Sequence, residues 1–554
     1  MPTDIEIAQC ATLRPIREVA EELGLGEAEL RLYGHYVAKV DLETLLARKP
    51  TARLVLVTAM TPTPAGEGKS TVSVGLVQAL RRLGRNAVLC LREPSLGPVF
   101  GMKGGAAGGG YSQVLPMEEI NLHFTGDFHA ITAANSLLSA ALDNNLHRGN
   151  SLGIDPRRIQ WQRATDMNDR ALRRVVVGLG GALNGVPREE RFTITAASEV
   201  MAIFCLATDL RDLEERLARI VLGVRSDGTL VSAAELKVSG AMALLMRDAL
   251  APNLVQTLEG GPAFVHGGPF ANIAHGCSSL IATRAALTLG DIVVTEAGFA
   301  SELGAEKFFD IKCRTGKLTP HAAVVVATIR ALKRHAGLPA AELTHPNPEA
   351  VRAGFPNLLH HIENVKQFGV PTIVAVNRFA SDSEQELTAV TELCKEAGAP
   401  CETADVWARG GEGGESLAAR LLQLLEDDGA DFRPLYPLEV PLAEKLETIA
   451  TRAYGARGIN MLPAAERAVT RFVAAGYGDL PVCVAKTQYS LSDNPALHGR
   501  PCDFEVTVRE LRLSAGAGFV VALTGDVLTM PGLPARPAAE AMRVHPDGRI
   551  EGLF

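Results

Sequence analysis

Residues 53–93 contain the feature that most limits the folds open to this chain. A short apolar run, RLVLVTA at residues 53–59, precedes a loop rich in glycine and proline. The segment VSVGLVQALRRLG that follows has the apolar spacing of a helix. A second apolar run, NAVLCLRE at residues 86–93, comes next. This order predicts a strand, a helix and a second strand that belong to one mostly parallel sheet.

The loop between the first strand and the helix has the composition of a phosphate-binding loop. Backbone N–H groups and the positive end of the helix dipole would point into one small volume there. Lys69 is expected to reach the terminal phosphates, and the Ser70 hydroxyl to meet a Mg²⁺ ion bound with ATP. A strict phosphate loop has glycine where this chain has Thr63. A tight turn with a helix cap is the alternative. The predicted ATP-binding residues are Thr63, Pro64, Ala65, Gly66, Glu67, Gly68, Lys69, Ser70 and Thr71.

Further apolar runs alternate with helical patterns along the chain. Strands are predicted at residues 192–197, 291–298, 323–329, 371–377 and 481–487, and helices at residues 213–224 and 383–398. The predicted class is α/β, with a P-loop NTPase-like, mostly parallel sheet flanked by helices and two smaller C-terminal α/β domains. The predicted domains are a large nucleotide-binding domain at residues 1–363, a second α/β domain at residues 364–478 and a small domain at residues 479–554.

Composition excludes several classes of protein. A chain of 554 residues exceeds one compact core, so two to four domains are expected. Its 55 basic and 63 acidic side chains give a net charge of −8 without a basic block, which argues against a nucleic-acid binder. No apolar run is long enough to cross a membrane, and no signal peptide is evident. Nine scattered cysteines without a C-x-x-C pair indicate reduced thiols, so a cytoplasmic protein is predicted.

The segment GMKGGAAGGGY at residues 101–111 allows close approach of a ligand or of neighbouring chain, although alone it could be a surface loop. Together with the flanking residues 92–131 and the phosphate loop, it closely resembles the formate–tetrahydrofolate ligase family. The resemblance continues to the C-terminus, for example in TEAGFASELGAEKFFDIKCR at residues 295–314 and TMPGLPARPAA at residues 529–539. Ala336 and Ala380 depart from the family pattern, which usually has glycine and often has proline at these positions.

The resemblance implies that ATP, formate and tetrahydrofolate react to give ADP, phosphate and 10-formyltetrahydrofolate through formyl phosphate. Phosphoryl transfer to formate needs positive groups around the migrating phosphoryl, which Lys69 and Mg²⁺ would supply in part. Arg92 follows the second predicted strand, where open α/β sheets bind ligands, and the family pattern assigns the matching arginine to formyl phosphate. Taken alone, Arg92 would more readily be read as part of a surface ion pair.

Three aromatic residues fall at positions that the family uses to stack the folate or the adenine. They are Phe299, Phe379 and Trp407, and without the resemblance each would be read as a core residue. Which ring stacks on which ligand stays open at this stage.

Glu93 and Asp127 are acidic residues near the predicted phosphate site, where bare carboxylates would repel ATP. Since the family is stimulated by K⁺ or NH₄⁺, the resemblance implies that these residues hold a monovalent cation or a polar edge of the folate. Structural ion pairing is the alternative. His123, His129, His266 and His275 lie in family-like segments without the spacing of a zinc site.

A second function fits the same loop. Switch ATPases also carry a phosphate loop on a parallel sheet, and VNRFASD loosely resembles the base-reading motif of GTPases, although Arg378 breaks that match. A catalytically silent relative is a third possibility, against which Lys69, Ser70 and Arg92 argue. The resemblance also implies a homotetramer that acts on small molecules, without a nucleic-acid or membrane partner.

Overall fold

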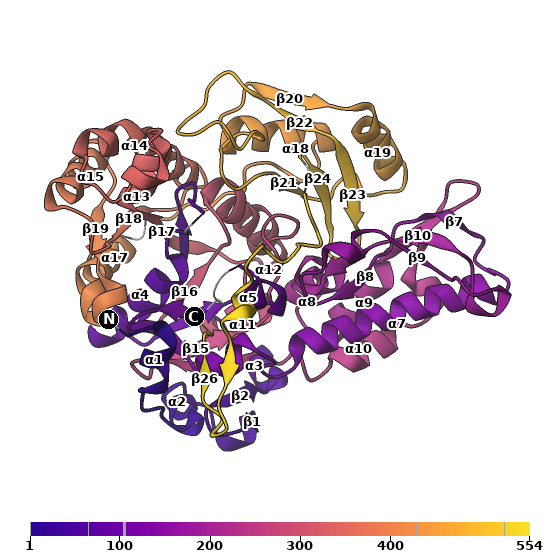
Figure 1. Ribbon diagram of the computed structural model, residues 1–554, viewed down its shortest axis with the longest axis horizontal. Helices are drawn as coiled ribbons and strands as arrows, with labels where there is room; N and C mark the ends of the chain where they lie inside the picture. The colour runs from indigo at the N-terminus through magenta and orange to yellow at the C-terminus, as the bar shows by residue number, and fades with distance from the viewer. Residues whose placement is uncertain (1, 65, 103–106, 428, 526, 554) are drawn as a thin grey trace.

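The computed structural model describes residues 2–64, 66–102, 107–427, 429–525 and 527–553 (Figure 1). A twelve-stranded sheet forms the centre, with the main strand order β1-β2-β14-β15-β4-β16-β3-β17-β18-β19. From β15 to β19 all neighbours are parallel, whereas β1, β2, β14 and the short β5 and β6 add an antiparallel edge.

The parallel strands are β15 (Pro262–Val265), β4 (Ala87–Leu91), β16 (Ile292–Glu296), β3 (Arg53–Ala59), β17 (Pro320–Ala327), β18 (Thr372–Asn377) and β19 (Cys401–Ala404). The antiparallel edge contains β1 (Leu30–Tyr33), β2 (Val37–Val40), β5 (Gly108–Gly109), β6 (Ser112–Leu115) and β14 (Asn253–Thr257).

Apolar side chains cover both faces of the sheet, which explains why its strands read as continuous apolar runs. In β3, Leu54 and Leu56 belong to one hydrophobic cluster, and Val55 and Val57 belong to another. Helices α4 (Lys69–Arg82) and α17 (Glu415–Glu426) pack in the second cluster, and α7 (Asp127–His147), α8 (Glu199–Leu206), α11 (Leu280–Leu289) and α14 (Pro348–Lys366) in the first. The predicted α/β class with a large, mostly parallel sheet and helices is confirmed.

Local signals located several elements correctly. The predicted strands at residues 53–59, 86–93 and 371–377 are β3, β4 and β18, and the predicted helix at residues 383–398 is α15 (Glu384–Glu396). Ser383 caps α15, since its side chain accepts a hydrogen bond from the backbone N–H of Glu386, and Gly398 follows with φ 63°.

Two predicted elements were wrong in part. Helix α9 (Leu210–Arg219) ends early, and the second half of the predicted helix at residues 213–224 is the strand β12 (Val221–Arg225). This strand pairs with β13 (Leu230–Ser232) and β7 (Ile154–Ile159), so sheet pairing overrides a weak helical pattern. The strand predicted at residues 192–197 is only β11 (Phe192–Ile194), outside the large sheet.

A lobe formed by residues 127–250 projects to one side of the sheet (Figure 1). We call it the projecting lobe. Besides α7 to α9, β7 and β11 to β13, it contains β8 (Arg163–Thr165), β9 (Val175–Val177), β10 (Arg188–Glu190) and α10 (Ser239–Met246).

The C-terminal region packs above this lobe in Figure 1. It contains a mixed three-stranded sheet of β21 (Val482–Ala485), β24 (Phe519–Leu523) and β23 (Glu510–Ser514). A pair of strands, β20 (Gly458–Met461) and β22 (Glu505–Val508), and helices α18 (Leu442–Thr448) and α19 (Pro463–Ala474) complete it. The large sheet continues through β18 and β19 beyond residue 363. The division of the chain at residues 363 and 478 stays a prediction.

None of the helices in the described part of the chain combines the length and the apolar character that crossing a membrane would need.

Candidate active site

Seven adjacent parallel strands bring their carboxyl ends to one edge of the large sheet, which is where open α/β sheets bind ligands. Except for Asp127, which begins α7, the residues predicted from sequence for the site follow five of them: the phosphate loop after β3, Arg92 and Glu93 after β4, Phe299 after β16, Phe379 after β18 and Trp407 after β19. Trp407 lies in α16 (Val406–Arg409), directly after β19. Distant parts of the sequence therefore meet at one edge because of strand order.

The phosphate loop turns into α4 at Gly68, which has φ 74°. A Cβ at Gly68 would lie 2.3 Å from Nδ2 of Asn377, so this position needs glycine both for its backbone conformation and for space. The Asn377 amide donates a hydrogen bond of 3.0 Å to the Glu67 carbonyl. Strand β18 thus holds the end of the loop in place. Ala65, which was predicted to bind ATP, lies outside the described residues.

The Glu67 side chain points back into the protein and fastens the loop. It is 1% exposed and accepts hydrogen bonds from the Thr63 backbone N–H at 2.7 Å and the Thr63 hydroxyl at 2.9 Å. The Thr328 hydroxyl, after β17, donates to its other oxygen. Thr63, which departs from the strict phosphate-loop pattern, therefore has a structural function that glycine could not fulfil.

Ser70 contacts an acidic residue that sequence analysis missed. Its hydroxyl donates a 2.8 Å hydrogen bond to Oε2 of Glu296, which is 2% exposed and ends β16, the strand beside β3. Lys69 is the first residue of α4. A carboxylate and a hydroxyl side by side offer the hard oxygen ligands that Mg²⁺ prefers. The sequence did contain a signal for Glu296, because this acidic residue lies near the end of the apolar run at residues 291–298.

Arg92 is half-buried at the end of β4. Its Nη1 donates to the Pro269 carbonyl at 3.2 Å, and its buried Nε has no hydrogen-bond partner within the described part of the chain. A Cβ at Gly298 would lie 3.3 Å from Nη1, so the guanidinium packs against the turn that precedes Phe299. The Arg92 guanidinium therefore keeps N–H donors, in a fixed planar geometry, that can bind an anion.

The charge of Asp127 acts on Glu93, but the two residues have different environments. Burial raises the pKa of Glu93 well above its ordinary value, the charge of Asp127 raises it further, and Oε2 of Glu93 has no hydrogen-bond partner among the described residues. Asp127 is paired with the ammonium of Lys39 at 2.9 Å and accepts a 2.8 Å hydrogen bond from Asn253. Both members of the ion pair are at most 2% exposed. Asp127 is thus paired within the protein, whereas Glu93 keeps an oxygen without a partner among the described residues.

The three predicted stacking residues are half-buried and lie outside the hydrophobic clusters. Phe299 has φ 61°, an uncommon value for an aromatic residue, and the Arg330 guanidinium lies 4.1 Å from the ring centre of Phe379. A Cβ at Gly110 would lie 2.8 Å from the indole of Trp407, so the glycine-rich segment packs against that ring. Of this segment, residues 103–106 lie outside the described part.

The four histidines have separate surroundings. His123 and His129 are in contact through ring nitrogens 2.7 Å apart. His266 lies between the Ser279 hydroxyl and the Ala249 carbonyl, and burial lowers its pKa to about 4. His275 is fully buried. Across the described ranges, no three or more His, Cys, Asp or Glu residues are grouped so that they could hold a metal ion.

Comparison with known proteins gives matches over the whole chain. The model of the formate–tetrahydrofolate ligase family matches residues 2–554. The chain is also 59% identical over 555 residues to a formate–tetrahydrofolate ligase of Granulibacter bethesdensis, with all of this chain and 97% of the relative covered.

This chain belongs to the formate–tetrahydrofolate ligase family.

Membership of the formate–tetrahydrofolate ligase family confirms the resemblance predicted from sequence, from the phosphate loop to the C-terminus. Sequence reasoning identified the residues of contiguous motifs. It missed Lys39, Glu296, Thr328 and Arg330, whose partners lie far away in the sequence.

Proposed function

We propose that the protein is a C–N bond-forming ligase that joins formate to tetrahydrofolate with ATP and gives 10-formyltetrahydrofolate, ADP and phosphate. Family membership over the whole chain supports this reaction, and it does not support the alternative of a switch ATPase. The observation that carries the proposal is the meeting of the phosphate loop, Arg92 and three half-buried aromatic rings at one edge of the sheet.

ATP binds at the loop in the manner of a P-loop NTPase. The start of the fourteen-residue helix α4 supplies backbone N–H groups and a positive dipole end, and Lys69 supplies a full charge. Ser70 and Glu296 are the residues that would hold Mg²⁺, which neutralises charge on the phosphoryl oxygens when bound with ATP. Glu67 keeps the loop in shape from behind and does not face the nucleotide.

Arg92 binds formate and then formyl phosphate. A formate oxygen attacks the terminal phosphorus of ATP, the bond to ADP breaks, and the product is formyl phosphate. The folate amine then attacks the formyl carbon, phosphate leaves with the bonding electrons, and the amine loses its proton. No protein nucleophile is needed, so catalysis depends on positioned positive charge.

Phe299, Phe379 and Trp407 provide the flat surfaces against which the folate rings and the adenine stack. Their partial burial supports this role, because each ring keeps part of its surface available. The Arg330 guanidinium on Phe379 fixes the orientation of that ring.

A monovalent cation such as K⁺ or NH₄⁺ binds beside Glu93. The unpartnered oxygen of Glu93 supports this proposal, while the pairing of Asp127 with Lys39 leaves Asp127 a smaller share in the site. A homotetramer, a cytoplasmic location and the two C-terminal domains are proposed with the family resemblance as their support.

The test is a spectrophotometric assay with purified protein, MgATP, formate, tetrahydrofolate and K⁺, in which acid converts the product to methenyltetrahydrofolate. We expect product only when all three substrates are present, and a lower rate when Na⁺ replaces K⁺. ATP hydrolysis without formyl transfer would contradict the ligase and favour the switch. Sedimentation that shows only monomers would contradict the tetramer.

A further inference from the structure

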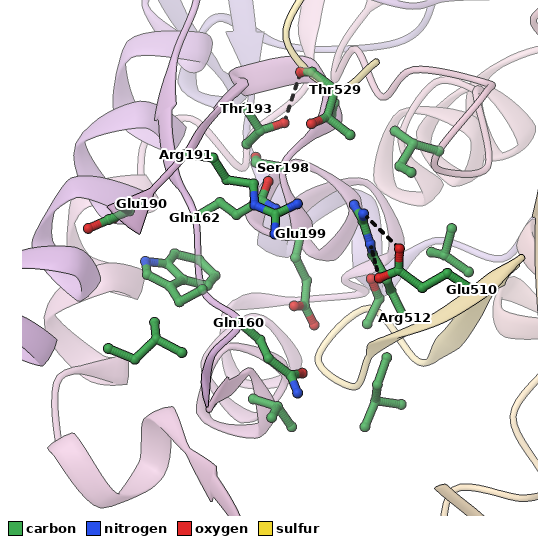
Figure 2. Close-up of a pocket in the computed structure, with 18 of the residues that line it drawn as sticks. Gln160, Gln162, Glu190, Arg191, Thr193, Ser198, Glu199, Glu510, Arg512 and Thr529 are labelled. Carbon is green, nitrogen blue, oxygen red and sulfur yellow. Dashed lines mark hydrogen bonds and ion pairs between the residues drawn. The ribbon is translucent and has the colours of Figure 1, made fainter. Parts of the chain in front are cut away.

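A cavity of about 600 Å³ lies between the projecting lobe and the C-terminal three-stranded sheet (Figure 2). Its walls come from residues 156–162 and 187–199 of the lobe and from residues 510–521 of the C-terminal region. None of the residues assigned above to ATP, formate, folate or the cation lines it. The space has the size of typical small-molecule sites, about 300–1,000 Å³.

Positive charge in this cavity is incompletely balanced. Arg188 and Arg512 have carboxylate partners, Asp143 at 2.6 Å and Glu510 at 3.0 Å. Arg191 has neither an ion pair nor a hydrogen bond within the described part of the chain. Figure 2 shows its side chain extending toward Arg512, above Glu199 in this view. The guanidinium therefore faces the cavity without a carboxylate of its own.

Glu199 does not supply the missing negative charge in full. Its Oε1 accepts a 2.8 Å hydrogen bond from the Gly516 backbone N–H, and burial raises its pKa to about 7. The carboxyl group is thus partly protonated near neutral pH, and the cavity keeps an excess of positive charge.

Asn135 gives a second, independent observation, which concerns a hydrogen-bond acceptor and not a donor. It lines the cavity from α7, is 1% exposed, and its Oδ1 has no hydrogen-bond partner among the described residues. A buried carbonyl oxygen without a donor costs free energy, so such an atom indicates a ligand or water that donates to it. Gln160 and Gln162 extend the polar wall, and Phe519 and Leu511 form an apolar one.

We propose that this cavity binds a small organic anion, with a carboxylate or phosphate group held by Arg191 and a hydrogen-bond donor directed at Asn135. The ligand would join two regions that already meet through backbone contacts, such as the 2.8 Å hydrogen bond from Ile194 to Thr529. Binding therefore stabilises the contact between the lobe and the C-terminal sheet. The site is separate from the ligase residues.

The test measures binding by calorimetry and thermal unfolding of the full chain with two probes, citrate and ribose 5-phosphate. Each carries an anionic group and hydroxyl donors, and neutral ribose is the control ligand. We expect one probe to bind with a Kd below about 1 mM and to raise the unfolding temperature, whereas ribose does neither. The probe that binds distinguishes carboxylate from phosphate recognition.

Variants locate the binding. Arg191→Ala and Asn135→Leu should each weaken the bound probe about tenfold or more, with Arg191→Gln as a substitute if the alanine variant folds poorly. Arg211→Ala is the matched control, because Arg211 lies in the same lobe, is exposed and pairs with Glu215, and neither residue lines the cavity. Lys69→Ala should keep the binding, which excludes the phosphate loop as its location. Absence of saturable binding by both probes, or equal loss in Arg211→Ala, would overturn the proposal.

Discussion

The phosphate loop and the cavity between the projecting lobe and the C-terminal sheet differ in whether their polar side chains have hydrogen-bond partners within the protein. In the loop, Glu67 is satisfied by Thr63 and Thr328, and the Glu67 carbonyl by Asn377. In the cavity, Arg191 and Asn135 lack such partners within the described residues. The loop is shaped before its ligand arrives, whereas the cavity leaves both groups for a ligand to satisfy. We therefore expect substitutions in the loop and substitutions in the cavity to change different properties of the protein.

The largest effect is expected for Lys69→Ala in the loop. Loss of the charge that faces the transferring phosphoryl should lower kcat/KM about 1,000-fold or more, or about 4 kcal/mol of transition-state stabilisation. The unfolding temperature should stay unchanged, and exposed Lys49→Ala should behave like the unsubstituted protein in both measurements. Near-normal turnover of Lys69→Ala would refute the assignment of the loop.

Glu67→Ala tests whether the buried Glu67 carboxylate holds the phosphate loop in its shape. The substitution leaves the Thr63 N–H, the Thr63 hydroxyl and the Thr328 hydroxyl without an acceptor, so the free energy of unfolding should fall by about 2–4 kcal/mol. KM for ATP should rise as well. Urea unfolding and initial rates measure the two effects, with exposed Glu21→Ala as the control. A change in KM alone would mean that Glu67 faces the nucleotide instead.

Ser70→Ala examines the proposed contact of Ser70 and Glu296 with Mg²⁺. Removal of one oxygen ligand should lower kcat about 10- to 100-fold at limiting Mg²⁺, and excess Mg²⁺ should restore part of it. The measurement is a Mg²⁺ titration of the initial rate. If the loss does not depend on Mg²⁺ concentration, the hydroxyl acts only through its hydrogen bond to Glu296.

The smallest effect is expected in the cavity, for Glu199→Gln. The folded-state pKa of Glu199, about 7, lies above its ordinary value of 4.5. Its contribution to stability is therefore fully present below about pH 4.5 and is lost as the pH rises through 7. The glutamine variant escapes this loss and should gain about 1 kcal/mol for each pH unit relative to the unsubstituted protein between about pH 5 and pH 7. The free energy of unfolding of both proteins can be measured by urea unfolding at several pH values. If it changes with pH in the same way in both, this interpretation is contradicted.

Much of the fold and part of the site could be predicted because their signals are contiguous. The phosphate loop, its flanking strand and helix, and the Ser383 cap of α15 each depend on neighbours within a few residues. Local backbone preferences and helix capping act over that range, so the order of residue types is sufficient. The same local reasoning was wrong at β12, where pairing with β7 decided the outcome.

The sequence by itself determined the family, the α/β class and the motif that begins α4. Only the tertiary structure placed Glu296 beside Ser70, paired Lys39 with Asp127, and assembled a cavity from the projecting lobe and the C-terminal sheet. These contacts depend on strand order and on packing between segments hundreds of residues apart. Their free energy comes from burial and from pairing of charges in a low-dielectric interior, which no local pattern of residues encodes.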